Sequence, residues 1–303
     1  METFATDAAG AKGAAGEARL KGSAARLSIA AAAFLILLKT ATGWLTGSIS
    51  VWASLLDSAM DIFASVINFY ALRAASRPPD EDHRYGHGKA ESLAGLFQSF
   101  VICVSGGFLL YEAARRIMTP RPTAQEWLGV GTMAVACGVS FALVARLRRV
   151  ARKTDSPALA ADAAHYATDV YTNGAALFAL LIVAVSGWTL ADPLISITIS
   201  CLILRSAYEV ARDSVHVLMD RRLPRAVDAK VAAVVGRFRH EGVVGFHDLR
   251  TRRSGSVKFI DLHLEVEGRK SLQEAHDLTV RVLRAIQQEI PRSRVQIHTD
   301  PAG

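Results

Sequence analysis

The distribution of apolar and polar residues divides the chain into two parts. From about Ser23 to Val210, long apolar runs alternate with short polar connectors that carry Lys and Arg. From there to Gly303 the chain is charged and contains short stretches in which apolar and polar residues alternate. The first pattern is typical of membrane-spanning helices and the second of a small water-exposed domain. The pattern therefore predicts a helical membrane domain followed by a smaller α+β domain.

Six apolar runs are long enough for a transmembrane helix, which needs roughly 20 residues to cross the hydrocarbon core. They lie at about 24–47, 49–74, 92–117, 126–147, 158–187 and 189–211. Residues 1–22 are rich in Ala, Gly and charged residues, so they have little apolar surface to bury and we expect a disordered tail there. The predicted domains are this tail at 1–22, a six-helix transmembrane domain at 23–211 and a cytoplasmic domain at 212–303.

The basic residues set the expected orientation in the membrane. Lys and Arg gather before the first run, between the second and third runs, and between the fourth and fifth, whereas the turns TGSIS and SGWTLAD carry none. The positive-inside rule therefore places both termini in the cytoplasm. Arg115, Arg116 and Arg121 lie on the outer side, against the rule. The net charge of +7 is concentrated in the cytoplasmic connectors and the tail, so it indicates topology and gives no indication of nucleic-acid binding.

Two of the apolar runs carry ionisable residues in their interior. SLLDSAMD contains Asp57 and Asp61, and HYATDV contains His165 and Asp169. Because residues four apart share a face of a helix, each run offers two ligands on one face. A charge at the centre of a membrane helix costs roughly 2.5–3.5 kcal/mol, and metal coordination compensates for such a cost. Three carboxylates and one imidazole suffice for a tetrahedral metal site; the alternative is a set of structural polar contacts.

The connector between the second and third runs, PPDEDHRYGHGKAES, suggests a second metal site. Asp80, His83 and His87 combine one carboxylate with two imidazoles, and Gly86 and Gly88 allow the backbone to bend around an ion. The alternative is an ordinary solvated loop. Its position on the same predicted side as the cytoplasmic mouth of the membrane site favours metal binding.

The C-terminal part predicts the order helix, strand, strand, helix, strand, a small α+β sandwich with one exposed sheet face. The helices are expected at about 224–240 and 271–290. Alternation in FIDLHLEVEG and RVQIHTD places His263 and His298 on the polar faces of strands. His247 is expected just before a further strand, and His276 on the second helix. Exposed histidines are often idle, but their clustering favours a third metal site.

The motifs SLLDSAMD, HRYGHGKAES, HYATDVYTNG, FHDLRTRRSG and IHTDP follow one another in this order. With them, the chain resembles the cation diffusion facilitator family, and most of all its bacterial zinc/ferrous-iron efflux pumps. The resemblance runs from about Arg26 to Ala302. It implies a homodimeric protein of the bacterial inner membrane with six transmembrane helices and a metallochaperone-like cytoplasmic domain. Such a protein is no enzyme; it exports a divalent cation from the cytoplasm in exchange for protons by alternating access.

The resemblance also implies roles for individual residues. It implies a transport site at Asp57, Asp61, His165 and Asp169, a loop site at Asp80, His83 and His87, and a binuclear cytoplasmic site at His247, His263, His276, His298 and Asp300. One or more ligands of the cytoplasmic site would come from the partner subunit. Lys89 and Asp220 match an ion pair that locks the dimer near the membrane surface. Thr299 departs from the family, which has a contributing glutamine there.

One imidazole with several carboxylates suits Zn²⁺ and also Cd²⁺, Fe²⁺ or Co²⁺. We expect zinc first, with Fe²⁺ or Cd²⁺ as further possibilities. An alternative function is a metal-sensing or scaffolding membrane protein whose cytoplasmic domain is the working part. An intramembrane metalloenzyme is disfavoured because the chain lacks H-E-x-x-H and because four ligands leave no open position for water. An antiporter for monovalent or organic cations would not account for the histidines.

Overall fold

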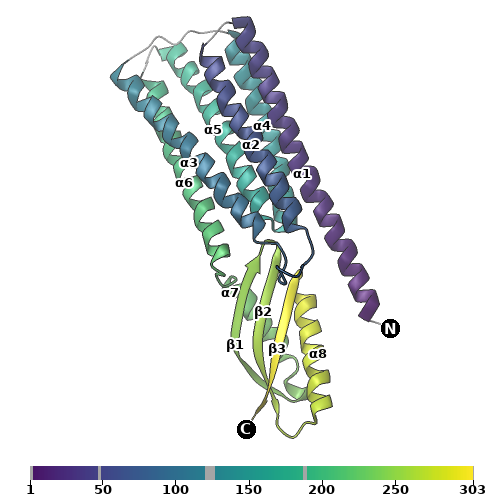
Figure 1. Ribbon diagram of the computed structural model, residues 1–303. Coiled ribbons are helices and arrows are strands. Elements are labelled where there is room, and N and C mark those ends of the chain that lie inside the picture. The colour runs from purple at the N-terminus through teal and green to yellow at the C-terminus, as the bar shows by residue number, and fades with distance from the viewer. Residues whose placement is uncertain (1–2, 47–48, 120–126, 187–189, 303) are drawn as a thin grey trace. The chain divides into compact units, whose positions relative to one another are not determined.

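The computed structural model describes residues 3–46, 49–119, 127–186 and 190–302. The chain divides into two compact units, Met1–Val215 and His216–Gly303. The first unit is built of long helices, and the second contains a three-stranded sheet with two helices (Figure 1).

Six long helices make up the first part of the chain. They are α1 (Thr3–Thr46), α2 (Ile49–Ala75), α3 (Ala90–Met118), α4 (Trp127–Thr154), α5 (Pro157–Ser186) and α6 (Ala191–Leu218). Within the described residues, four stretches are long and apolar enough to cross a membrane. These stretches are Gly16–Thr42, Ala90–Met118, Val130–Thr154 and Pro193–Leu218. The predicted helical membrane domain is therefore confirmed.

Helix α1 begins at Thr3, whereas the sequence predicted a disordered tail over residues 1–22. Near the end of this segment, Lys21 is buried and its Nζ lies 2.6 Å from Oε1 of Glu91 on α3. The partner lies 70 residues away in sequence, so the low apolar content of the segment gave no sign of the contact. Residues before Ser23 thus take part in the packing of the helical unit.

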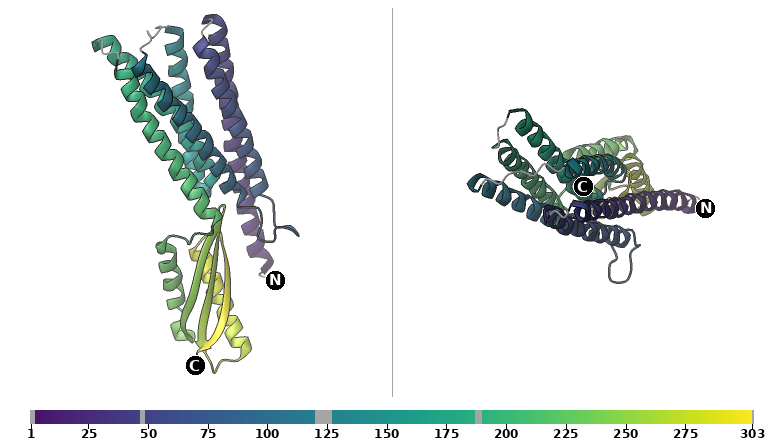
Figure 2. Two further views of the ribbon diagram at one scale, coloured as in Figure 1. Left: turned by 60° about the vertical axis from the view of Figure 1, so that its left-hand side comes forward. Right: turned by 90° about the horizontal axis from the view of Figure 1, so that it is seen from above.

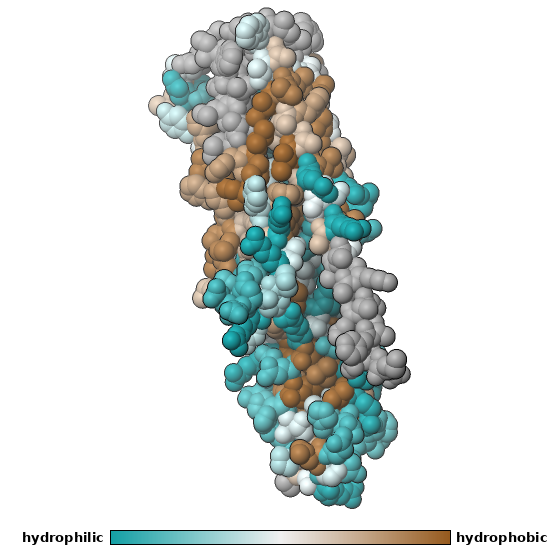
Figure 3. Space-filling model, turned by 45° about the vertical axis from the view of Figure 1, so that its right-hand side comes forward, coloured by the Kyte–Doolittle hydropathy of each residue, from teal (hydrophilic) through white to brown (hydrophobic). Residues whose placement is uncertain are grey.

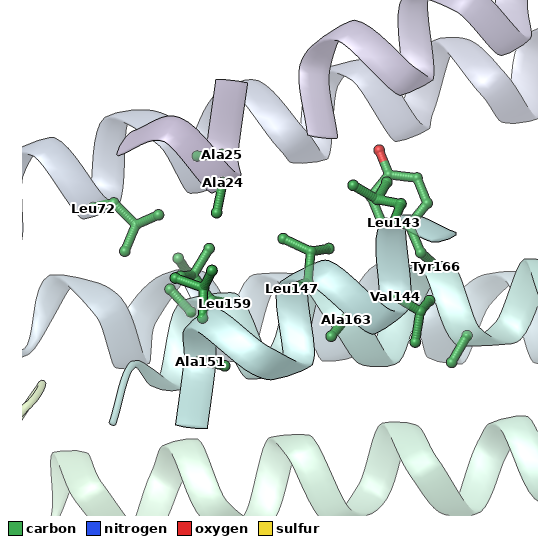
Figure 4. Packing of buried hydrophobic residues seen from close by; sticks show 14 residues of the cluster. Ala24, Ala25, Leu72, Leu143, Val144, Leu147, Ala151, Leu159, Ala163 and Tyr166 are labelled. Atoms are coloured by element: carbon green, nitrogen blue, oxygen red, sulfur yellow. The ribbon is translucent and has the colours of Figure 1, made fainter. Parts of the chain in front are cut away.

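Small side chains bring the first five helices together. Ala24 and Ala25 of α1 pack with Leu147 of α4 and Leu159 of α5 in one buried cluster (Figure 4). Small residues let helix backbones approach closely, which is the main source of helix association in lipid. The ring of Tyr166 on α5 also belongs to this cluster and is fully buried, and Figure 4 shows its hydroxyl at the edge, pointing toward the neighbouring helices.

Two glycines of α3 allow α6 to approach it. A Cβ atom on Gly95 would lie 2.7 Å from Oγ of Ser214, and a Cβ on Gly106 would lie 2.8 Å from Cγ2 of Ile203. The two glycines are about three helical turns apart and so share a face of α3. A larger residue at either position would require the side chain of Ser214 or Ile203, or the helix that carries it, to shift.

The second unit has the predicted order of elements. It contains α7 (Arg225–Gly236), a short 3₁₀ helix (Arg239–Glu241), β1 (Val243–Ser254), β2 (Val257–Glu267), α8 (Leu272–Glu289) and β3 (Ser293–Ala302). In the sheet, β2 lies between β1 and β3, antiparallel to β1 and parallel to β3. The parallel pair needs a crossover, which α8 provides. The α+β fold expected from the sequence is therefore confirmed.

The two helices cover one face of the sheet and leave the other exposed (Figure 2). Ile260, Leu262 and Leu264 of β2 are buried beneath α7 and α8, and the residues between them are only half-buried. Helix α8 begins with a capping box, in which Ser271 and Glu274 each accept a hydrogen bond from the other's backbone N–H. The exposed face of the sheet is where the histidines lie.

Candidate metal centres

The structure describes half of the predicted transport site. His165 and Asp169 lie one turn apart on α5; His165 is 2% exposed and Asp169 is partly buried. Asp57 and Asp61 belong to α2, but their side chains lie outside the described residues. The assembly of these four side chains therefore stays a prediction.

Helices α2 and α5 nevertheless meet through a polar contact close to these positions. The hydroxyl groups of Ser65 on α2 and Tyr166 on α5 are 2.9 Å apart, and both side chains are buried. Ser65 stands one helical turn after Asp61 in the sequence, and Tyr166 directly follows His165. The contact therefore joins the two helices at the level of the ionisable residues.

Asp162 is a further buried acid on α5, outside the predicted transport site. Its exposure is only 1%, and Oγ of Ser28 on α1 donates to its Oδ2 at 2.7 Å. The Tyr166 hydroxyl donates to the carbonyl oxygen of Ser28 at 3.2 Å, so Asp162 and Tyr166 of α5 both bond to Ser28 of α1. A buried carboxylate is costly unless it is hydrogen-bonded, so α1 supplies the compensation. Asp162, His165 and Asp169 share a face of α5, the spacing that would have revealed it.

The loop between α2 and α3 brings its three predicted ligands together. One ligand atom each from Asp80, His83 and His87 lies within 4.8 Å of the others. The Asp80 carboxylate is 3.3 Å from Nδ1 of His83 and 3.1 Å from Nε2 of His87. Gly86 adopts a φ of 87°, which only glycine tolerates easily, and this turn returns His87 toward Asp80. Two imidazoles and a carboxylate in this arrangement match three of the four ligands of a zinc site.

Backbone geometry keeps the Asp80 carboxylate ionised. The backbone N–H of His83 donates to its Oδ1 at 2.6 Å, and this bond is the main cause that lowers the pKa of Asp80 below its usual value. On His87, the buried Nδ1 atom has no hydrogen-bond partner among the described residues. An ionised carboxylate beside two imidazoles is the form that binds a cation.

The second unit, His216–Gly303, which we call the cytoplasmic unit after its predicted location, contains a row of three histidines across all three strands. His247 of β1 is paired with His263 of β2, and His263 is paired with His298 of β3. Neighbouring rings are 5.1 Å and 4.8 Å apart between centroids. His247 lies within β1 and not before it, which corrects the predicted strand boundary. The strand register therefore places three imidazoles side by side on the exposed sheet face.

Asp300 of β3 holds this row together. Its Oδ2 is 2.9 Å from Nδ1 of His263 and 3.3 Å from Nε2 of His247, and its Oδ1 is 3.1 Å from Nε2 of His298. The hydrogen bond with His263 is the main cause that lowers the pKa of Asp300, and the three nearby histidines add to the shift. We call His247, His263, His298 and Asp300 the sheet cluster.

The surroundings of the sheet cluster differ from the expected cytoplasmic site at His276 and Glu265. His276 lies exposed on α8, and among the described residues it is not grouped with the histidines of the sheet cluster. Glu265, which was not predicted, lies 3.8 Å from Nε2 of His247 through its Oε1. Its place on the polar face of β2, two residues after His263, was a usable signal. Thr299 bonds to Thr279 of α8 at 2.8 Å, on the helix-covered side of the sheet.

The two residues of the predicted dimer ion pair belong to different units. Lys89 lies in the helical unit, directly before α3. Asp220 lies in the cytoplasmic unit, where Nη1 of Arg252 donates to its Oδ1 at 3.4 Å. The pairing of Lys89 with Asp220 stays a prediction.

Family models match nearly the whole chain. The cation efflux transmembrane domain matches residues 25–219, and the cytoplasmic domain of cation efflux proteins matches residues 223–302. The chain belongs to the cation efflux family. This cation efflux protein is an integral membrane transporter and not an enzyme, and the resemblance noted from its motifs is confirmed.

Full-length relatives support the same assignment. The cation-efflux pump FieF of Yersinia pestis (strain Pestoides F) is 42% identical over 286 residues, which cover 94% of each chain. FieF of Salmonella newport (strain SL254) is 42% identical over 285 residues, again 94% of each chain. The metal-bound C-terminal domain of the CzcD transporter from Thermotoga maritima is 33% identical and covers 26% of this cation efflux protein and 90% of its own chain, with a TM-score of 0.24.

Proposed function

We propose that this cation efflux protein exports divalent metal ions from the cytoplasm in exchange for protons, by alternating access. Zn²⁺ is the first candidate substrate, and Fe²⁺ and Cd²⁺ are the next. The transport ligands are Asp57, Asp61, His165 and Asp169. The protein works as a homodimer in the bacterial inner membrane, with both termini in the cytoplasm. The full-length relatives, which are cation-efflux pumps, support the direction of transport.

One observation carries the proposal for the transport site. The 2.9 Å contact between Ser65 and Tyr166 joins α2 to α5 one turn from Asp61 and next to His165. Because residues four apart share a helix face, Asp61 belongs to the same stripe of α2 as Ser65. This supports the convergence of the two ligand pairs between these helices.

The chemistry of the ligands supports coupling to protons. Carboxylates and an imidazole must be deprotonated to bind a metal ion, so protons and metal compete for the same lone pairs. A more acidic outer side promotes release of the metal there, and the protons that take its place return inward when the site reopens to the cytoplasm. Three carboxylates also provide more negative charge than a monovalent cation needs, which favours a divalent substrate.

The ligand types support zinc as the first candidate. Imidazole suits Zn²⁺, Fe²⁺ and Cu²⁺ better than Mg²⁺ or Ca²⁺, which prefer oxygen ligands alone. Zn²⁺ accepts a tetrahedral set of one nitrogen and three oxygens. Replacing the imidazole of His165 by a carboxylate would therefore favour harder cations such as Mn²⁺.

The two exposed clusters would hold regulatory metal ions on the cytoplasmic side. Asp80, His83 and His87 form one cluster, and the sheet cluster forms the other. In the dimer, His276 of the partner subunit and the Lys89–Asp220 pair would complete the arrangement. Metal bound at the sheet cluster would draw the two cytoplasmic domains together and so shift the transporter's conformational equilibrium.

The test is metal transport by the purified protein in sealed liposomes. Under an imposed pH gradient, we expect Zn²⁺ flux that dissipates the gradient and is abolished by Asp61→Asn or Asp169→Asn. Asp213→Asn, which changes an exposed carboxylate near the end of α6, is the matched control and retains flux. Zinc binding to the cytoplasmic clusters without any flux would instead support the metal-sensing function.

A further inference from the structure

A cavity of about 340 Å³ lies between α1 and α2 in the helical unit. Its walls carry four cationic side chains: Arg19, Lys21 and Arg26 from α1, and Arg73 from α2. Phe69 and Leu72 of α2 supply its apolar part. None of these residues belongs to the metal centres.

Three of the four cations have no carboxylate partner among the described residues. Lys21 is paired with Glu91 at 2.6 Å. Within the part of the chain that the structure describes, no carboxylate forms an ion pair with Arg19, Arg26 or Arg73. Nε of Arg26 donates only to the carbonyl oxygen of Gly22, at 3.3 Å. The cavity therefore has a surplus of guanidinium groups that an anion can satisfy.

The cavity lies at the level along the helices where lipid headgroups are expected. Arg26 directly precedes the charge-free apolar run 27–38 of α1, and Arg73 lies in the last turn of α2, near the end of the apolar segment Ile62–Ala75. Both ends belong to the side of the membrane that is predicted to face the cytoplasm. Figure 3 shows a hydrophobic surface over the upper part of the helical unit, with hydrophilic side chains gathered below it.

The side chains favour a phosphate group attached to an apolar tail. A guanidinium presents a planar fork of N–H donors that matches the oxygens of phosphate, and basic pockets between membrane helices bind anionic lipid headgroups. Leu72 is 3% exposed and belongs to the helical core, so it forms only the floor of the cavity, whereas Phe69 is partly exposed on its wall. Free inorganic phosphate would gain nothing from the ring of Phe69, but the first carbons of a lipid tail would.

We propose that the cavity between α1 and α2 binds the phosphate headgroup of an anionic phospholipid of the cytoplasmic leaflet. Arg19, Arg26 and Arg73 hold the phosphate, and the ring of Phe69 contacts the start of an acyl chain. The bound lipid joins α1 to α2 close to the place where Lys21 joins α1 to α3. The proposal concerns lipid binding and does not depend on which metal is transported.

The test uses the full-length protein purified in a neutral detergent. Bound lipid is counted by native mass spectrometry after addition of phosphatidylglycerol or phosphatidylcholine, and the melting temperature is measured with each lipid and with inorganic phosphate. We expect phosphatidylglycerol alone to remain bound and to raise the melting temperature. The double variant Arg26→Gln/Arg73→Gln should weaken this binding by about tenfold or more, since it removes two charge-assisted hydrogen-bond donors to the phosphate.

The matched control is Arg148→Gln/Arg149→Gln, which removes the same charge from exposed positions on the same predicted side of the membrane. This control should retain wild-type lipid binding. Equal losses in both double variants would overturn the proposal in favour of general surface attraction, and equal stabilisation by inorganic phosphate would overturn the lipid assignment. If the glutamine variant fails to fold, Arg26→Lys/Arg73→Lys keeps the charge but lacks the guanidinium fork. Weaker binding by that variant supports the site, and unchanged binding contradicts it.

Discussion

The ammonium group of Lys21 on α1 lies 2.6 Å from the carboxylate of Glu91 on α3, and only 7% and 3% of the two side chains are exposed. The hydroxyl of Ser156, directly before α5, also donates to this carboxylate. One buried anion therefore joins the middle of α1 to the starts of α3 and α5. Among the ion pairs that the structure describes within the helical unit, this pair is the shortest and the most buried.

Removing one partner of this pair should destabilise the protein strongly. Lys21→Met leaves Glu91 as a buried, uncompensated charge, which costs about 3–5 kcal/mol. The double variant Lys21→Met/Glu91→Leu removes both charges and should recover most of the loss. Thermal unfolding of the purified protein in detergent measures both effects.

The matched control is the exposed pair of Arg269 and Glu267 in the second unit, which is 2.9 Å long with 84% and 36% of the side chains exposed. Because water screens such a pair, Arg269→Met should cost less than about 1 kcal/mol. Similar losses for Lys21→Met and Arg269→Met would show that burial of the Lys21 pair has no energetic consequence.

Features that depend on local periodicity could be predicted from the sequence. Alternation predicted β2 with the buried Ile260, Leu262 and Leu264, and the apolar pattern predicted a helix at about 271–290, where α8 lies. In the loop, Asp80, His83 and His87 are so close in sequence that a single turn brings them together. These features rest on residues within a few positions of one another. The i, i+4 ligand pairs rest on the same kind of pattern and stay a prediction.

Features that depend on distant partners could not be predicted in this way. Lys21 is buried because Glu91 lies against it, and Asp162 is buried because Ser28, 134 residues away, donates to it. Nothing near Lys21 or Asp162 in the sequence identifies these partners. Glu265 was not predicted as part of the cytoplasmic site for another reason. Its place on β2 was evident from the sequence, but its approach to His247 follows from the strand register.

The capping box of α8 predicts an effect of pH on stability. The hydroxyl of Ser271 donates to Glu274 at 2.7 Å and is the main cause that lowers the pKa of Glu274 below 4.5. Because the folded protein favours the ionised form, the contribution is fully present above pH 4.5 and is lost as the pH falls through the lowered pKa. Glu274→Gln should therefore reduce stability near neutral pH and have no further effect in strong acid.

Hydrogen exchange of the first-turn amides of α8 measures this local stability. Comparison of wild type and Glu274→Gln at each pH cancels the intrinsic effect of pH on exchange. Ser271→Ala, which removes the cap, should cost about 1 kcal/mol near neutral pH. A difference between wild type and Glu274→Gln that is the same at pH 7 and in strong acid would rule out the ionised cap.

The sheet cluster predicts an order of effects on zinc binding to the cytoplasmic unit. His263 is central in the row and contacts Asp300, so His263→Ala should remove the first zinc ion from the cluster. Glu265→Gln should lower the affinity for that zinc ion by about tenfold, because a carboxylate outside the metal's ligand set orients the histidine that it contacts. His276→Ala should leave the first zinc ion in place, since His276 lies on α8. Competition with a zinc-binding dye measures all three, and loss of the first zinc ion in His276→Ala alone would contradict this arrangement.

The central claim, that Asp57, Asp61, His165 and Asp169 bind one metal ion together, is tested most directly with Co²⁺. In a variant whose exposed clusters are removed by His83→Ala, His87→Ala, His247→Ala and His263→Ala, we expect one Co²⁺ per chain with the visible absorption of a tetrahedral site. Asp57→Asn, Asp61→Asn, His165→Ala and Asp169→Asn should each abolish or alter that spectrum, and Asp213→Asn should not. A tetrahedral spectrum that survives all four substitutions unchanged would contradict the account.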